Sequence, residues 1–239
     1  ADQMDFLDRD AYYSGATYGV IDIERTIKTM ALVSNEIVFY EKGINSVEAF
    51  LIARDHMYSS VYVHHVASIA DKMLLRAAES AIKNIPDFYA YTDDQLLSAL
   101  RGANAYSKEM IDRIIYRNLF KRALVVSSMG VRHETLEKLR ELASLGEKKI
   151  EEKLCSRTGI KKGYVLVDMP AENLKVAEPR LKSVNVRLLR KDGAMVPVYQ
   201  VSGVARALSK KESTHELFSV FSRREDVPEA KKAAEKLLK

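Results

Sequence analysis

The sequence contains little cysteine and lacks a long apolar run. Its 239 residues include one cysteine, Cys155, which excludes an internal disulfide framework and a zinc-knuckle pattern. No apolar stretch approaches the roughly 20 residues that a membrane-spanning helix needs, and no signal peptide is visible. We therefore expect a soluble protein of the reducing cytoplasm that does not have a membrane as a partner.

Familiar catalytic and phosphate-binding motifs are also absent. The sequence contains no GxxxxGKS/T, no GxGxxG, no HExxH and no GxSxG. These motifs mark P-loop proteins, dinucleotide-binding folds, zinc proteases and serine hydrolases. None of these classes has support in the sequence, which also lacks internal repeats and low-complexity tracts.

The composition is that of a folded protein with a mild excess of positive charge. Hydrophobic residues make up 47% and charged residues 30% of the chain, and the formal net charge is +5 with a pI near 9.1. This length holds one large domain or two modest ones. The charge excess suits anionic ligands such as phosphates, but it does not by itself indicate nucleic acid.

The first half of the chain is predicted to be mainly helical. Residues 45–85 contain no Gly or Pro, and their apolar residues recur at intervals of three and four, which indicates a long helix, with or without a kink. Asn45 and Ser46 are its candidate N-caps. The remaining expected elements are a helix at residues 1–10, a loop at 13–22, a helix leading into a strand over 23–41 with a hairpin near 36–43, and helices at 92–102 and 107–124, the last capped by Ser107.

The second half has the pattern of a smaller α+β module. A charged amphipathic helix is expected over 132–159 and a helix near 201–209, and residues 227–239 are expected to form a last helix or a frayed tail. Strands are expected at 164–170, 184–189, within 191–200 and at 215–222, with Pro170 and Pro179 in a connection. The predicted domains are therefore residues 1–128, part of a helical domain, and residues 129–239, the α+β module.

Two sets of side chains could form a binding site. Asp2, Phe6 and Asp10 are spaced four apart, and each step of four turns a helix by roughly 400°, so the three share one face. Arg54, Tyr58 and Tyr62 have the same spacing, and an Arg beside two tyrosines can bind phosphate while the rings flank a sugar or base. The alternatives are a solvated acidic first turn and tyrosines that pack on a neighbouring helix.

A third set is basic. Arg117 and Lys121 are spaced i, i+4 within the expected helix at 107–124, and with Lys42 they could bind an anion. The alternative is an exposed basic helix face.

Three segments, taken together, resemble one family. ADQMDFLDRDAYYSGATYGVID (1–22) resembles the last metal-ligand segment of the HD-domain phosphohydrolases, and ARDHMYSSVYVHHV (53–66) resembles a helix of the same family. YRNLFK (116–121) resembles a segment of the deoxynucleoside triphosphate triphosphohydrolases. The three occur in the family's order and cover roughly the first half of the chain. The resemblance implies an HD-type helical domain and metal-dependent hydrolysis of nucleotides.

The resemblance also implies a role for each matching residue. Asp2 would be the last ligand of a divalent metal ion such as Mg, Mn, Ni or Fe. Arg54 would hold substrate phosphate, Phe6 would pack against the nucleotide, Asp10 would accept a hydrogen bond from the sugar 3′-hydroxyl, and Tyr62 would stack where a 2′-hydroxyl would clash. Tyr58 is the catalytic candidate, at the place of a His in relatives, and Gln3, a substrate contact, replaces a Lys or Arg. Arg117 and Lys121 would contact an activating nucleotide at a subunit interface, and Lys42 is the third candidate for that anion site.

The sequence departs from the family pattern in one further respect. Members bind their metal with a set of the form H…HD…D, but no His–Asp dipeptide occurs in these residues. We therefore expect an upstream part of the same polypeptide to carry the other ligands, and this chain alone to be inactive. The family also implies a homo-oligomer.

Two classes of function remain open. The first is a nucleotide triphosphohydrolase that needs its upstream half. The second is a non-catalytic module for nucleotide binding, oligomerisation or nucleic-acid binding. Nucleic acid is the less favoured partner, because the basic residues of the second half are closely mixed with Glu, as in EKKIEEK (147–153).

Overall fold

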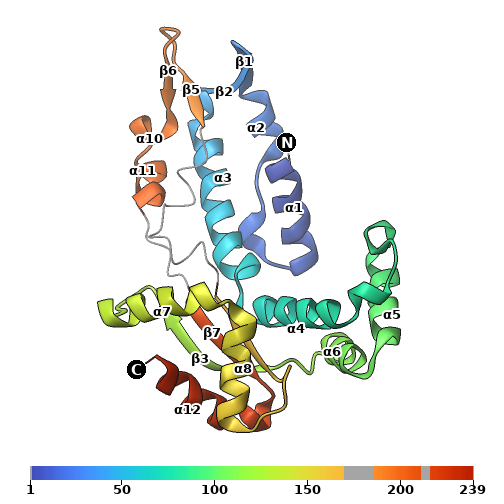
Figure 1. The fold of residues 1–239 in the computed structure, drawn as a ribbon. Helices are drawn as coiled ribbons and strands as arrows, with labels where there is room; N and C mark the ends of the chain where they lie inside the picture. Colours follow the sequence, from blue (N-terminus) through green and yellow to red (C-terminus); the bar gives the residue numbers. More distant parts are fainter. Residues whose placement is uncertain (1, 170–185, 211–215, 239) are drawn as a thin grey trace. The chain divides into compact units, whose positions relative to one another are not determined.

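The chain divides into two compact units in the computed structural model, which describes residues 2–169, 186–210 and 216–238 (Figure 1). The first unit comprises Ala1–His64 and Ala177–Ser213, and the second comprises His65–Val176 and Thr214–Lys239. This division does not follow the expected one at residue 128. Strand pairing over long sequence distances gives each unit a segment from the second half of the chain.

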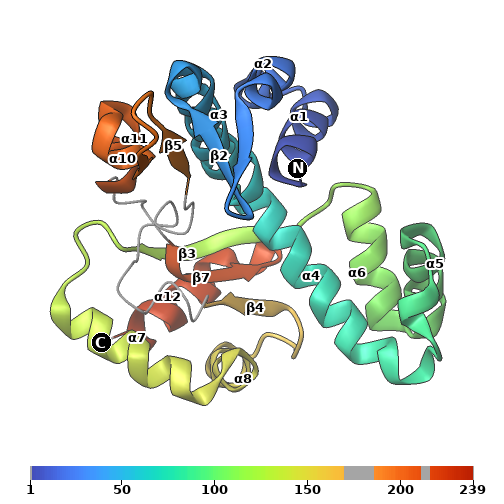
Figure 2. The same ribbon diagram turned by 90° about the horizontal axis from the view of Figure 1, so that it is seen from above.

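The first unit is built around α3. Its elements are α1 (Asp2–Ser14), the 3₁₀ turn η1 (Thr17–Gly19), α2 (Ile23–Lys28), β1 (Met30–Val33), β2 (Glu36–Tyr40), the 3₁₀ turn η2 (Glu41–Gly43), α3 (Ile44–Met57), the π-helical turn η3 (Tyr58–Tyr62), β5 (Arg187–Leu189), β6 (Met195–Pro197), α10 (Val198–Val201) and α11 (Gly203–Lys210). In both ribbon views α3 runs between α1 and α11 (Figures 1 and 2). A buried cluster of Val47, Leu51, Leu188, Val198 and Ala205 joins α3 to the later segment.

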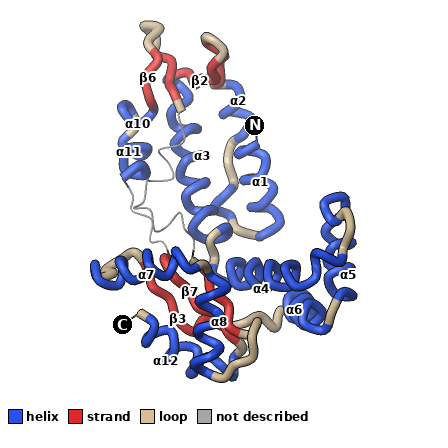
Figure 3. The backbone as a smooth tube through the Cα atoms, viewed as in Figure 1, coloured by secondary structure: helices blue, strands red, loops and turns tan. Residues whose placement is uncertain are grey.

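A four-stranded sheet belongs to the same unit, with strand order β1-β2-β5-β6. A hairpin is present, as predicted, but it is formed by β1 and β2 and lies earlier than the expected 36–43. Its two turn residues, Ser34 and Asn35, both have positive φ, as a tight hairpin turn of the right twist requires. The neighbouring pairing is parallel, with Phe39 opposite Leu188, and Figure 3 shows these short strands beside the helices of the unit.

The long helix expected over 45–85 is wrong as a single element. α3 begins at Ile44 after Gly43, so neither Asn45 nor Ser46 is its N-cap. The helix ends in the π turn, and α4 begins anew at His65, where the second unit also begins. The pattern of apolar residues continues through the break, which neither Gly nor Pro marks.

The second unit contains a three-stranded antiparallel sheet with helices on both faces. Its elements are α4 (His65–Ala81), the 3₁₀ turns η4 (Ile82–Asn84) and η5 (Phe88–Ala90), α5 (Asp93–Ala103), α6 (Ala105–Ile115), β3 (Lys121–Ser127), α7 (His133–Leu145), α8 (Glu147–Thr158), β4 (Val165–Asp168), β7 (Glu216–Ser222), the 3₁₀ turn η7 (Arg224–Asp226) and α12 (Val227–Leu237). The strand order is β3-β7-β4. Alternate residues of β4 face opposite sides: Val165 and Val167 pack with α7, α8 and α12, and Leu166 packs with α4 and α6.

Three local expectations in this unit can be compared with the structure. The capped helix at 92–102 is confirmed as α5, where Thr92 and Gln95 form a complete capping box. The helix at 107–124 is wrong: α6 is capped by Asn104 and ends at Ile115, and the chain then enters β3 because its apolar residues complete the sheet. The helix at 132–159 is divided at Gly146, whose φ of 81° no continuous helix allows.

The structure confirms the predicted fold class, a mainly helical N-terminal half followed by a smaller module with small sheets. Of the expected strands, 164–170 and 184–189 extend into residues outside the described part, as does the connection with Pro170 and Pro179. None of the helices in the described ranges combines the length and apolar character that a membrane crossing needs.

A buried cluster of charges ties α4 and α8 to the sheet of the second unit. Glu147 and Glu151, one turn apart on α8, accept hydrogen bonds from the backbone N–H groups of Met169 and Val167 at 3.0 Å and 2.9 Å. Arg76 of α4 donates to both carboxylates, at 3.1 Å to Glu147 and 2.7 Å to Glu151. The two glutamates therefore satisfy the outer edge of β4, and an arginine compensates their charge.

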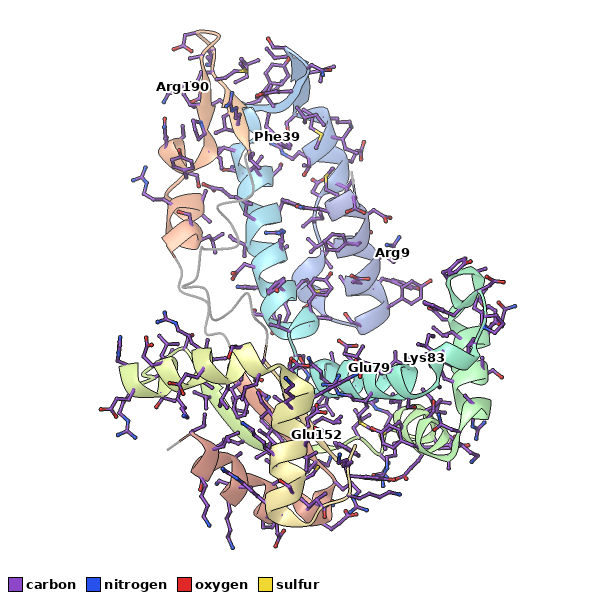
Figure 4. The ribbon with its side chains drawn as sticks, in the orientation of Figure 1. Arg9, Phe39, Glu79, Lys83, Glu152 and Arg190 are labelled. Carbon is purple, nitrogen blue, oxygen red and sulfur yellow. The ribbon has the colours of Figure 1, made fainter. Side chains whose placement is uncertain are left out.

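A cavity of about 330 Å³ lies beside this cluster. Glu79 and Glu152, which Figure 4 labels on α4 and α8, both line it. Their carboxylates pair with Lys148 and Lys162, each at 3.1 Å. The charged side chains that line the cavity are thus paired within the protein.

Candidate functional site

The first unit brings α1 against the C-terminal end of α3. Leu7 and Ala11 of α1 pack against Ala53 and Met57 of α3, and all four are buried. After Met57 the helix widens into the π turn, closed by a hydrogen bond of 3.0 Å from the N–H of Val63 to the carbonyl of Tyr58. Single π turns are uncommon and occur frequently at functional sites.

Three of the predicted substrate residues meet at this π turn. The Tyr62 hydroxyl donates a hydrogen bond of 2.7 Å to Asp10 Oδ2, across 52 positions of sequence. The Phe6 ring lies edge-on to the Tyr62 ring, with centroids 5.9 Å apart. Phe6, Asp10 and Tyr62 are all half-buried. The rings of Phe6 and Tyr62 thus form an aromatic wall beside the Asp10 carboxylate, whose second oxygen can accept a hydrogen bond from a hydroxyl group.

The surroundings of Tyr62 keep its hydroxyl protonated. Burial, followed by the hydrogen bond to Asp10 and that residue's negative charge, raises the pKa of Tyr62 well above its ordinary value. Because the Tyr62 hydroxyl keeps its proton and donates it in the hydrogen bond to Asp10, Tyr62 acts as a neutral hydrogen-bond donor and not as a base. The rings of Tyr58 and Tyr62 lie 6.3 Å apart at 61°, so Tyr58 belongs to the same aromatic group.

The raised pKa of Tyr62 predicts a change in alkaline stability. Above about pH 10 an unfolded tyrosine loses its proton while folded Tyr62 keeps it, so the folded state binds more protons and stability falls as pH rises. Tyr62→Phe removes this contribution. We expect the variant to lose less unfolding free energy than the parent between about pH 9 and about pH 11, measured by chemical denaturation. Tyr12→Phe is the control, because the Tyr12 side chain is exposed to solvent; an equal loss in all three proteins would contradict the prediction.

Arg54 lies one turn before Tyr58 on α3 and is half-buried. Within the described parts of the chain, no hydrogen bond or ion pair engages its guanidinium. An arginine in this state can donate two parallel hydrogen bonds to a phosphate. The predicted stripe of Arg54, Tyr58 and Tyr62 therefore exists in part: the two tyrosines make contact, and the structure shows no contact that joins Arg54 to them.

Asp2 and Gln3 lie at the other end of α1. Both are exposed and line a mainly apolar cavity of about 400 Å³ with residues that include Phe39, labelled in Figure 4. Phe6, Asp10 and Tyr62 do not line it. Among the described residues no group of three or more His, Cys, Asp or Glu side chains could hold a metal ion. Asp2 offers one carboxylate ligand, which does not form a metal site by itself, so its metal role stays a prediction.

The basic set differs from its expected geometry. Arg117 follows the end of α6 with a left-handed φ of 53°, and Lys121 is the first residue of β3. They therefore do not share a helix face, although both are exposed. Lys42 lies over the Tyr40 ring at 5.4 Å in the first unit, and a common anion site for the three stays a prediction.

Two residues of this region went unnoticed in the sequence. Tyr18 of η1 packs edge-on against His56 of α3, with centroids 5.5 Å apart. Gly19, the next residue, is buried between the helices. The glycine-containing loop at 13–22 was the available signal, but a loop pattern does not show which helix it contacts.

The geometry of this region can be set beside known proteins. A family model described as "HD associated region" matches residues 21–239. The chain belongs to the HD-associated region family. It is 32% identical over 238 residues to the uncharacterized protein MJ1154 of Methanocaldococcus jannaschii, covering 96% of this chain and 50% of that protein. It is 24% identical over 159 residues to the deoxynucleoside triphosphate triphosphohydrolase SAMHD1 homolog of Dictyostelium discoideum, covering 61% of this chain and 31% of that one.

Two solved structures share the fold of this HD-associated region. A hypothetical protein from Aquifex aeolicus superimposes with a TM-score of 0.66 at 24% identity, over 98% of this chain and 56% of its own. A phosphohydrolase from Bacteroides thetaiotaomicron gives a TM-score of 0.62 at 22% identity, over 93% and 60%. The chain thus spans about half the length of MJ1154 and little more of these two chains. The likeness supports an HD-type fold.

Proposed function

We propose that the site between α1 and the π turn binds the sugar and phosphates of a deoxynucleoside triphosphate in a metal-dependent phosphohydrolase of the HD type. The observation that carries the proposal is the Tyr62–Asp10 hydrogen bond of 2.7 Å with the Phe6 ring at its side. An aromatic wall beside a hydrogen-bonded carboxylate is chemistry suited to a sugar hydroxyl and its ring. The names of the Dictyostelium triphosphohydrolase and the Bacteroides phosphohydrolase support the reaction class.

Each residue of the site has a defined task under this proposal. Asp10 accepts the 3′-hydroxyl of the sugar through the oxygen that Tyr62 does not engage, and Tyr62 crowds the 2′ position. The Arg54 guanidinium binds a phosphate of the substrate and stabilises the negative charge that develops as the phosphorus–oxygen bond breaks. Tyr58 carries the hydroxyl placed to donate a proton.

A divalent metal ion orients water and offsets negative charge in reactions of this class. Asp2 would supply one carboxylate ligand for such an ion, and we propose that the other ligands of the ion come from a part of the enzyme outside these residues. The complete enzyme is further proposed to be a homo-oligomer.

Sugar selection tests the proposal directly. We expect the full-length enzyme to hydrolyse dGTP faster than GTP, and Tyr62→Ala to narrow the ratio of the two catalytic efficiencies by roughly tenfold, the equivalent of about 1.4 kcal/mol. Product release is measured in paired reactions, and Tyr12→Ala is the control because the Tyr12 ring is 81% exposed. Equal rates on both sugars in the parent enzyme would remove the deoxynucleotide assignment and leave only the broader phosphohydrolase class.

A further inference from the structure

The turn η1 lies where α1 meets the end of α3. A Cβ atom added to Gly19 would lie 2.8 Å from Ala11 Cβ, 2.8 Å from the carbonyl oxygen of Leu7 and 3.0 Å from Met57 Cγ. Leu7 and Met57 are both completely buried. The carbonyl belongs to the backbone of α1, so it cannot move aside alone, and Met57 has no solvent-exposed space into which to turn. The space around Gly19 is therefore too small to hold one added methyl group.

These contacts directly adjoin the site residues. Ala11 follows Asp10 on α1, and Met57 precedes Tyr58 at the start of the π turn. Tyr18 fixes the same turn from the side, by its edge-on contact with His56. Any side chain at position 19 would push α1 and the end of α3 apart, and the hydrogen bond of 2.7 Å between Asp10 and Tyr62 spans that separation.

We propose that Gly19 is a positioning residue that sets the distance between α1 and the π turn, so that Asp10 and Tyr62 stay bonded and select the sugar of the substrate. The inference rests on the proposed function for its catalytic consequence, but the spacing itself can be measured without substrate. Gly19 does not contact the substrate in this proposal; it acts through the helix separation.

A double-mutant cycle between Gly19→Ala and Tyr62→Phe tests the spacing. In the parent protein, Tyr62→Phe should lower the folding equilibrium constant by about 2- to 10-fold, the usual effect of losing one hydrogen bond. In the Gly19→Ala background the bond is already broken, so Tyr62→Phe should have almost no further effect. Gly203→Ala is the matched control, because a Cβ at Gly203 meets no atom within 4 Å, and Tyr62→Phe should keep its full effect there. Equal effects of Tyr62→Phe in all three backgrounds would overturn the inference.

Should Gly19→Ala fail to fold, Ala11→Gly is added to it. This second change removes Ala11 Cβ, one of the two atoms closest to the new Cβ, and leaves the contact of 2.8 Å with the carbonyl oxygen of Leu7. The cycle is then measured in this background against Ala11→Gly alone. A smaller effect of Tyr62→Phe in the protein with both changes supports the inference, and an unchanged effect overturns it.

The catalytic consequence is measured separately on the full-length enzyme. Gly19→Ala should narrow the dGTP-to-GTP ratio of catalytic efficiencies several-fold, while Gly203→Ala leaves it unchanged; general loss of folded enzyme would lower both rates and leave the ratio alone. A ratio that stays at the parent value in Gly19→Ala counts against the inference. Absence of nucleotide hydrolysis by the parent enzyme counts instead against the proposed function, since the cycle does not depend on it.

Discussion

Replacing Arg76 by methionine should lower the unfolding free energy by about 3–5 kcal/mol, the usual cost of removing one partner from a buried ion pair. Arg76 is 7% exposed, and its guanidinium donates to Glu147, Glu151 and Glu79. Methionine fills much of the volume but leaves Glu151 without the arginine that pairs with it at 2.7 Å, while Glu147 keeps its pair with Lys72 at 2.6 Å. Denaturant unfolding followed by helical circular dichroism measures the change.

Two further variants separate charge from packing. Arg140→Met removes an arginine from an exposed pair with Glu137, at 2.6 Å on the same helix, and should cost no more than about 1 kcal/mol. Adding Glu151→Gln to Arg76→Met should recover part of the loss, because the amide oxygen still accepts the N–H of Val167 without carrying a charge. A loss for Arg76→Met no larger than that for Arg140→Met would show that the cluster adds little to stability.

The largest expected effect on activity is that of Arg54→Ala. The proposed contact between its guanidinium and a substrate phosphate is a charge-assisted hydrogen bond, worth about 1.5–3 kcal/mol, so catalytic efficiency should fall roughly 10- to 150-fold. Alanine is a good helix former, and α3 should therefore stay folded. Initial rates of dGTP hydrolysis by the full-length enzyme, over a range of substrate concentrations, give the loss.

The matched control is Arg25→Ala, which removes an exposed arginine from α2 in the same unit. Its efficiency should stay close to that of the parent. An effect of Arg54→Ala no greater than that of Arg25→Ala would assign Arg54 to the protein surface and not to the substrate.

The sequence predicted those elements whose boundaries depend on residues only a few positions apart. The capping box of Thr92 and Gln95 sets the start of α5 through hydrogen bonds three residues apart. The β-branched and aromatic residues of β2 indicated a hairpin in this region, although the turn lies before them, at Ser34 and Asn35. The same reasoning failed at α6, where Asn104 caps the helix in place of Ser107, and where strand pairing takes residues 121–124 into β3.

The candidate site could be predicted only in pieces. Helical spacing placed Phe6 and Asp10 on one face of α1, and it placed Tyr58 and Tyr62 on one stripe of the next long helix. Nothing in either pattern states that the two helices touch. The packing of Leu7 and Ala11 against Ala53 and Met57 brings them together, across a sequence distance that no periodicity measures.

By itself, the sequence determined the fold class, most of the helices and the residue types of the site, because each of these depends on neighbours within a few positions. The tertiary structure alone decided which segments form each unit. Phe39 of β2 pairs with Leu188 of β5, 149 positions later, and β7 pairs with β3 and β4, whose residues lie 89–101 and 51–57 positions before their partners in β7. It also decided the break after Tyr62, the hydrogen bond from Tyr62 to Asp10 and the close fit of Gly19. These features depend on the shapes of packed surfaces, which emerge only when distant parts of the chain bury the same apolar residues together.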